Sequence, residues 1–238
     1  KLDVTANGNF AIYSLSGDVD VLSKADVTCN SKLTAIMAIS NGGKITIDDS
    51  SVNAYSTYNM WKTIDSNSDL TIENSTVDCS GVGAALSSSN GDINIISSTV
   101  TAVSSENRAL ITDYYYQNKS ISITNGSDVT LESHGETSSC ISTDSLTVKN
   151  SSLKITSLGE WTTTEIYQNI EIADSSVSIF SIYNNNDGGY IALSCYSGIS
   201  IENSDVYAES NGNYAICSWY DNCLLYTSPS PRDQRGSR

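Results

Sequence analysis

A short phrase recurs along the chain about every 25 residues, and this repeat limits the fold more than any other feature of the sequence. The phrase is an aliphatic, a polar and a second aliphatic residue, with another aliphatic residue five or six positions further on. Successive copies are separated by 26, 25, 23, 28, 25, 24 and 29 residues. The copies begin at Val19, Ile45, Leu70, Ile93, Ile121, Leu146, Ile170 and Ile199. A period of this length is the signature of a stacked repeat architecture.

The aliphatic pairs have a period of two, which predicts short strands with one buried face. Each period contains two more apolar segments, such as Val77-Asp78-Cys79 and Ala85-Leu86. We therefore predict an all-β right-handed parallel β-helix (β-solenoid) of about eight coils, with three short strands per coil. A β-sandwich would explain the alternation but not a phrase that returns at a fixed period.

A corner between the first and second strand of each coil carries a recurring polar residue. Asn and Asp tolerate the left-handed backbone conformation better than other residues with a side chain, and a sharp corner requires that conformation. Stacked coils would place these side chains in a row, which predicts a polar ladder. The residues are Asp49, Asn74, Ser97, Asn125, Asn150, Asp174 and Asn203.

The end of the chain departs from the repeat. Both prolines, Pro229 and Pro231, and three of the four arginines lie in the last ten residues. The run from Leu224 resembles a translated sequencing-adaptor read-through. We expect residues 1–222 to be a β-helix fragment of a longer, multidomain chain, and residues 223–238 to be a non-native or disordered tail.

Charge and hydropathy exclude several classes of function. The net charge of −15 would repel phosphate backbones, so nucleic acid is not an expected partner. No apolar run approaches the length of a transmembrane helix, so membrane insertion is not expected either. The acidic, Ser-, Thr- and Asn-rich composition is typical of an extracellular or cell-surface bacterial protein.

The cysteines and the single histidine do not suggest a catalytic or zinc site. Cys29 and Cys79 share one repeat position with small apolar residues, and Cys140 takes the place of a repeated alanine. These three are expected to be buried free thiols. His134 alone cannot form a zinc site, and no Ser-His-Asp constellation is visible.

Four aspartates are candidate calcium ligands because calcium prefers carboxylate and carbonyl oxygens. Asp69 and Asp92 occupy the same position in adjacent coils, just before the first strand, and Asp48 and Asp49 lie at a corner. Calcium is thus the only cofactor that the sequence suggests. Solvated acidic side chains explain the same pattern, because no dense calcium-binding loop is present.

Aromatic residues gather in the variable loops between strands. The chain contains 14 Tyr and 3 Trp but only 2 Phe. Tyr and Trp combine an apolar face with a polar edge, which suits stacking against sugar rings. Shielding of the apolar core is the alternative interpretation. The candidate carbohydrate-binding residues are Trp61, Tyr58, Tyr115, Trp161 and Tyr167.

The coils over residues 10–222 resemble bacterial secreted parallel β-helix proteins of the pectate-lyase-like, carbohydrate-binding and adhesin type. This resemblance implies non-catalytic binding of a plant or host polysaccharide, assisted by calcium. A structural stalk or adhesin repeat of a bacterial surface protein is the alternative. A pectin-active lyase or hydrolase is a second alternative, but the motifs of polygalacturonases are missing: Asp48-Asp49 is the only Asp-Asp pair and His134-Gly135 follows a serine. No catalytic residue is therefore assigned.

Overall fold

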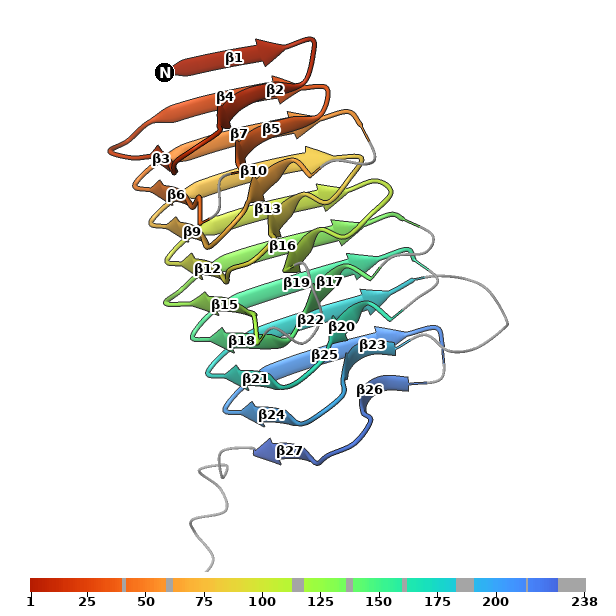
Figure 1. The fold of residues 1–238 in the computed structure, drawn as a ribbon. Helices are drawn as coiled ribbons and strands as arrows, with labels where there is room; N and C mark the ends of the chain where they lie inside the picture. The colour runs from red at the N-terminus through yellow and green to blue at the C-terminus, as the bar shows by residue number, and fades with distance from the viewer. Residues whose placement is uncertain are drawn as a thin grey trace, which may run out of the picture.

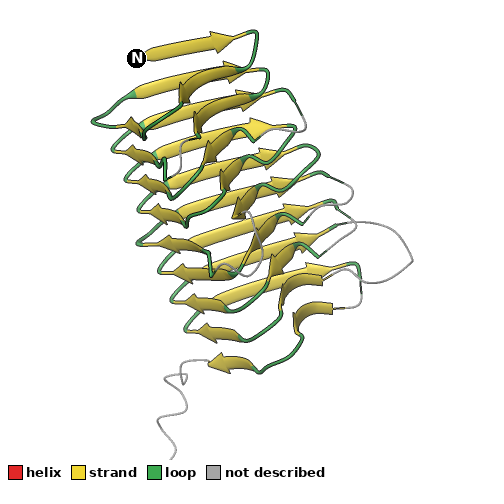
Figure 2. Cartoon of the chain, in the orientation of Figure 1, coloured by secondary structure: helices red, strands yellow, loops and turns green. Residues whose placement is uncertain are grey.

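The computed structural model describes residues 1–39, 42–58, 62–112, 118–135, 139–159, 162–182, 191–212 and 214–226. These residues form a rod of stacked coils in which each coil contributes one strand to each of three parallel sheets (Figure 1). Strands and loops account for all of the described residues, and none of them is helical (Figure 2). The predicted all-β parallel solenoid is thus confirmed, with nine strands in each sheet and a step of roughly 25 residues between neighbouring strands.

The strands of the three sheets alternate along the chain. Sheet A contains β1 (Leu2–Ala6), β4 (Asp26–Ser31), β7 (Ser51–Ser56), β10 (Thr76–Gly81), β13 (Thr99–Ser104), β16 (Asp128–Ser133), β19 (Ser152–Ser157), β22 (Ser176–Ser181) and β25 (Asp205–Ser210). Sheet B contains β2 (Phe10–Ser14), β5 (Thr34–Ala38), β8 (Ile64–Ser66), β11 (Leu86–Ser88), β14 (Leu110–Thr112), β17 (Ile141–Thr143), β20 (Thr164–Ile166), β23 (Ile191–Cys195) and β26 (Tyr214–Ser218). Sheet C contains β3 (Val19–Val21), β6 (Ile45–Asp48), β9 (Leu70–Glu73), β12 (Ile93–Ile96), β15 (Ser120–Thr124), β18 (Ser145–Lys149), β21 (Ile170–Ala173), β24 (Ile199–Glu202) and β27 (Cys223–Tyr226).

The repeated aliphatic pairs are the strands of sheet C, and they stack in register. Ile93 pairs with Leu70 on one side and with Ile121 on the other, and both neighbours are in parallel strands. The pairing is less regular in sheet B, where β20 and β23 share the single register pair Ile166 with Cys195. The aliphatic phrase therefore fixes the register of sheet C most strongly, because a slip by one residue would turn every aliphatic side chain outward.

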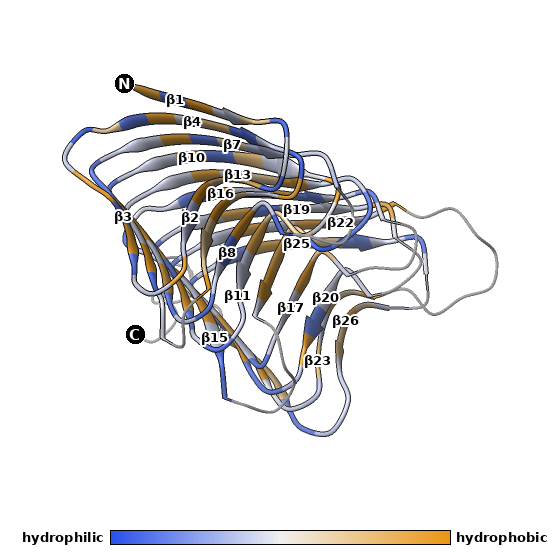
Figure 3. Ribbon diagram, turned by 45° about the horizontal axis from the view of Figure 1, so that its top comes forward, coloured by the Kyte–Doolittle hydropathy of each residue, from blue (hydrophilic) through white to orange (hydrophobic). Residues whose placement is uncertain are grey.

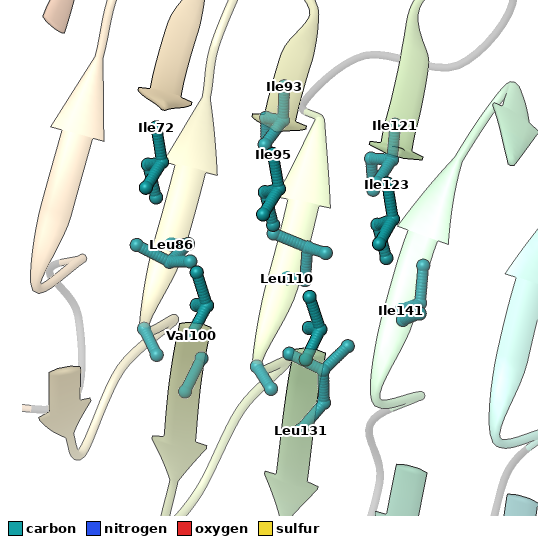
Figure 4. Packing of buried hydrophobic residues seen from close by; sticks show 14 of the residues in the cluster. Ile72, Leu86, Ile93, Ile95, Val100, Leu110, Ile121, Ile123, Leu131 and Ile141 are labelled. Atoms are coloured by element: carbon teal, nitrogen blue, oxygen red, sulfur yellow. The ribbon is translucent and has the colours of Figure 1, made fainter. Parts of the chain in front are cut away.

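The inward side chains form one apolar core along the rod. Leu86, Ile95 and Val100 come from sheets B, C and A, and all are at most 1% exposed. They lie close together inside a coil, and the equivalent residues of the next coils continue the same rows (Figure 4). Hydrophobic and hydrophilic residues alternate along the strands, so the outer surfaces of the sheets are largely polar (Figure 3). Burial on three sides makes each coil depend on its neighbours for its core.

The predicted corners between sheet C and sheet A are confirmed. All seven expected corner residues have a positive φ, between 47° for Asp49 and 59° for Asn125. The corner of Asn125 holds one extra residue, Gly126, which also has a positive φ of 80°. Glycine adopts this conformation at no steric cost, so it allows the insertion without displacing the strands.

The continuous hydrogen-bonded ladder at this corner is formed by the serine that follows each predicted corner residue, and not by the corner residue itself. The corner side chains themselves are exposed, whereas each following serine points inward. Its Oγ accepts the backbone N–H of the preceding coil at 3.0–3.2 Å and donates to a carbonyl of its own coil at 2.5–2.8 Å. The serines of this ladder are Ser50, Ser75, Ser98, Ser127, Ser151, Ser175 and Ser204. A backbone N–H that would otherwise be buried without a partner is thus satisfied at each corner.

Three of the cysteines lie where the repeat placed them. Cys29, Cys79 and Cys140 are fully buried free thiols, as expected, and Cys195 is buried as well. Cys217 is half-buried and Cys223 is exposed. The buried thiols therefore act as small core residues.

Strand pairing continues four residues past the expected boundary at residue 222. β27 (Cys223–Tyr226) pairs in parallel with β24, so that Cys223 lies opposite Ile199 and Leu225 opposite Ile201. Residues 227–238, which contain both prolines, lie outside the described residues. The described solenoid thus ends at Tyr226.

Candidate functional site

The five candidate aromatic residues belong to the two loop rows that border sheet B. Tyr58 and Trp61 lie in the connection from β7 to β8, and Trp161 lies in the corresponding connection from β19 to β20. Tyr115 and Tyr167 lie in connections from sheet B to sheet C. Trp61, Tyr115 and Trp161 are outside the described residues, whereas Tyr58 is described and exposed. Of the two described residues, Tyr58 precedes a strand of sheet B and Tyr167 follows one.

Among the described residues, Tyr167 stacks with two further tyrosines. Its ring lies parallel to that of Tyr196, with 5.5 Å between the ring centroids, and Tyr196 stacks on Tyr220 at 6.0 Å. The three residues occupy equivalent turns of successive coils, since the N–H of Tyr220 donates to the carbonyl of Tyr196 and the N–H of Tyr196 to that of Ile166. Exposure rises to 83% at Tyr220, whose outer ring face is therefore the accessible one. The sequence pattern did not identify Tyr196 and Tyr220 as site residues, because the register of this part of the repeat is irregular.

A groove of about 380 Å³ lies on the same three coils as this tyrosine stack. Asn169, Gly198 and Asn222 line it, and each comes two residues after one of the stacked rings. The Oδ1 atom of Asn169 accepts the N–H of Gly198 at 3.1 Å, which leaves the amide NH₂ group as a donor. The groove continues over the outer face of sheet C, past Glu171, Ser200 and Leu224, and Asp221 lines it from the turn before β27.

Two carboxylates give the groove a negative rim. Glu171 pairs with the Lys149 ammonium at 2.8 Å, and both side chains are about half exposed. Asp221 accepts the backbone N–H of Asn222 at 2.8 Å. The groove therefore offers amide donors, a hydroxyl and carboxylate acceptors next to an aromatic surface, which is the set of groups that binds polyhydroxylated ligands.

Several side chains on the outer face of sheet B are buried. Its outward column runs in register through Met37, Asp65, Ser87, Ile111, Ser142 and Glu165. Met37, Ser87 and Ser142 are at most 5% exposed. The Oγ atom of Ser87 is fully buried and has no hydrogen-bond partner among the described residues.

Two basic side chains lie along this face. Lys62 contacts Asp65 at 3.4 Å and donates to Ser89 of the next coil at 3.1 Å. Arg108 donates from Nε to Ser139 at 3.2 Å and from Nη2 to Glu165, two coils away, at 3.0 Å. The Arg108–Glu165 pair is only about one quarter exposed, so its charges compensate each other at the surface of sheet B.

The structure places the candidate calcium ligands at two separate ends of sheet C. Asp69 and Asp92 are in equivalent positions before β9 and β12, as predicted, but their carboxylates bind backbone groups. Asp69 Oδ1 accepts the N–H of Asp92 at 3.2 Å, and Asp92 Oδ1 accepts the N–H of Ser120 at 2.7 Å. The Lys44 ammonium, 2.9 Å from Asp69, holds the pKa of that carboxyl below its usual range.

Asp48 is the last residue of β6 and Asp49 follows it, at the other end of the strand. The Asp48 carboxylate accepts a hydrogen bond from the Asn74 amide at 3.3 Å, and Asp49 is an exposed corner residue. A strand of four residues separates this pair from the end where Asp69 and Asp92 lie, so the four carboxylates do not converge. Within the described ranges, no group of three or more His, Cys, Asp or Glu side chains is arranged to hold a metal ion.

No protein-family model matches the chain, and no curated protein or solved structure is significantly similar to it. In the part of the chain that the structure describes, no helix is long and apolar enough to cross a membrane.

Proposed function

We propose that the chain is an extracellular bacterial rod that binds an extended polysaccharide without cleaving it. The observation that carries this proposal is the groove beside the stack of Tyr167, Tyr196 and Tyr220. The sugar would contact the outer face of Tyr220 and the ring edges of the other two tyrosines. Hydroxyl groups of the sugar would bind Asn169 and Asn222.

The repeat supports binding of a long ligand. Three coils at a spacing of ~4.8 Å give a site roughly 10 Å long. Weak contacts at successive coils add through multivalency when one chain of sugars lies along the rod. The two loop rows that border sheet B, with Tyr58, Trp61, Tyr115 and Trp161, would extend this surface toward the other end.

The charge of the groove predicts its preference among glycans. Lys149 compensates the charge of Glu171, but Asp221 and the net charge of −15 still repel a uronate polymer, so a neutral glycan such as xylan or glucan fits the groove directly. A uronate polymer would require a bridging cation, and calcium suits carboxylate oxygens on both sides. Binding of polygalacturonate at this groove should then be lost when a chelator is added.

Affinity electrophoresis tests the proposal. We expect xylan or glucan in the gel to retard the protein, and Tyr220→Ala to weaken this retardation by roughly three- to tenfold, the effect of losing one aromatic contact. Trp61→Ala and Trp161→Ala should weaken it too. Tyr207→Ala is the matched control, because Tyr207 is an exposed tyrosine on the outer face of sheet A. An unchanged mobility in all three glycans, with and without calcium, would overturn the proposal.

A structural stalk is the second candidate function. One core and one serine ladder run from coil to coil without interruption, which suits a spacer that holds another domain away from a surface. A rod that binds no glycan on a broad array would favour this role. Release of reducing sugar or of an unsaturated product from the same glycans would instead reveal an enzyme.

A further inference from the structure

A second groove lies at the other end of the rod, on the outer face of sheet A. It has a volume of about 470 Å³ and spans the first three coils. Thr5, Asn30 and Tyr55 form one outward column of its floor and lie in register in β1, β4 and β7. Asn7, Lys32 and Thr57, each two residues further along its coil, also line the groove.

The charge of this groove differs from that of the rest of the protein. The described residues that line it include no Asp or Glu, although the chain has a net charge of −15. Lys32 is exposed and forms no ion pair with the described residues, whereas Lys44, Lys62 and Lys149 each contact a carboxylate. The groove therefore presents an uncompensated positive charge on an acidic surface.

The other groups suit a sugar ring. Tyr55 is 49% exposed, so part of its ring is accessible to a sugar. The side-chain amides of Asn7 and Asn30 can donate to and accept from hydroxyl groups, and Thr5 and Thr57 add hydroxyls. An ammonium group beside these residues adds recognition of a carboxylate, since a hydrogen bond between two charged groups is stronger than a neutral one.

We propose that this groove binds a carboxylated sugar residue, whose carboxylate pairs with the Lys32 ammonium while its ring lies against Tyr55. The site is separate from the groove beside the tyrosine stack. It rests on the proposed function only because both sites are proposed to bind a carbohydrate. Because Lys32 supplies the positive charge, no bridging cation is required. Uronates and sialic acids share this chemistry, and the experiment distinguishes the two sources.

Isothermal titration calorimetry with matched ligands tests the inference. Trigalacturonate is compared with its methyl ester, and 3′-sialyllactose with lactose, in the presence of a chelator. We expect the carboxylated member of at least one pair to bind more tightly. Lys32→Met should weaken that binding by roughly three- to tenfold, and so should an increase in salt concentration. Lys154→Met is the control, because Lys154 is an exposed lysine of sheet A outside the groove.

The outcomes separate this inference from the proposed function. Equal binding of the charged and neutral member of both pairs, or an effect of Lys154→Met as large as that of Lys32→Met, would overturn the Lys32 site. If the Lys32 site were overturned but xylan or glucan still retarded the protein, the proposed function would stand. Loss of neutral-glycan binding with retention of Lys32-dependent binding would overturn the tyrosine-stack site alone. Circular dichroism verifies that each variant is folded.

Discussion

Replacing Ser98 by alanine should show how much one member of the serine ladder contributes to stability. Ser98 is 3% exposed, and its Oγ accepts the N–H of Ser75 at 3.0 Å and donates to the carbonyl of Ile96 at 2.7 Å. The Ile96 carbonyl retains a second donor, because the N–H of Asn74 also binds it at 3.0 Å. Among the described residues, no other group accepts the N–H of Ser75. The cost of Ser98→Ala is therefore mainly that of one buried, unsatisfied N–H.

An unsatisfied buried donor costs about 1–3 kcal/mol. For a chain of this size, a loss of about 2 kcal/mol corresponds to a decrease in Tm of roughly 4–8 °C. Thermal and urea unfolding, followed by circular dichroism, measure the change. Thr99→Ala removes an exposed hydroxyl from the next residue and should change Tm by much less. Equal decreases for Ser98→Ala and Thr99→Ala would refute the role assigned to the ladder.

Three further predictions concern the core, the thiols and one carboxylate. Ile95→Asp places an unpaired charge in the fully buried core and should cost more than about 4 kcal/mol, seen as loss of the folded circular dichroism signal, whereas Asn94→Asp on the outer face should be tolerated. Burial raises the pKa of Cys29 and Cys195 to about 11 and raises that of Cys79 and Cys140 further, so these four thiols should react slowly with a thiol reagent until the protein unfolds. Cys223 is exposed and should react at once. Equally fast labelling of Cys79 would contradict its inward placement. Lys44 lowers the pKa of Asp69 below its ordinary value of 3.8, so this carboxylate stabilises the fold above that pH and the contribution is lost as the pH falls through the lowered pKa. Asp69→Asn should thus lower Tm at pH 7, and the difference in Tm from the wild type should shrink below about pH 4. A difference in Tm that does not depend on pH would contradict the stabilising role of the ionised Asp69 carboxylate.

The aliphatic phrase predicted most of the fold because each strand of sheet C repeats the same inward pair. The corners were predictable too, since Asn and Asp mark the left-handed conformation. The inward serine was missed, although it follows the corner residue directly in six coils and after Gly126 in the seventh. Serine is common both at surfaces and in turns, so its burial became visible only when the coils were stacked.

The functional residues were less predictable because they depend on contacts between coils. Asp69 and Asp92 occupy equivalent positions as predicted, but the sequence could not show that their carboxylates bind backbone N–H groups of the next coil. Arg108 and Glu165 are 57 positions apart, so no local pattern joins them. The tyrosine stack required the register of β20, β23 and β26, where the repeat is least regular.

The uneven pairing of sheet B has a mechanical consequence. The strands lie across the rod, so the hydrogen bonds between coils run along its axis (Figure 1). Tension between the two ends therefore loads each interface between coils in series, and within one interface the three sheets share the load. In sheet B the β20–β23 interface has one register pair, Ile166 with Cys195, and the side chains of Thr164 and Ser194 add hydrogen bonds across it. At the interface where Tyr167 meets Tyr196, a pulling force along the rod would thus be borne mainly by the six register pairs of β22 with β25 and the four of β21 with β24.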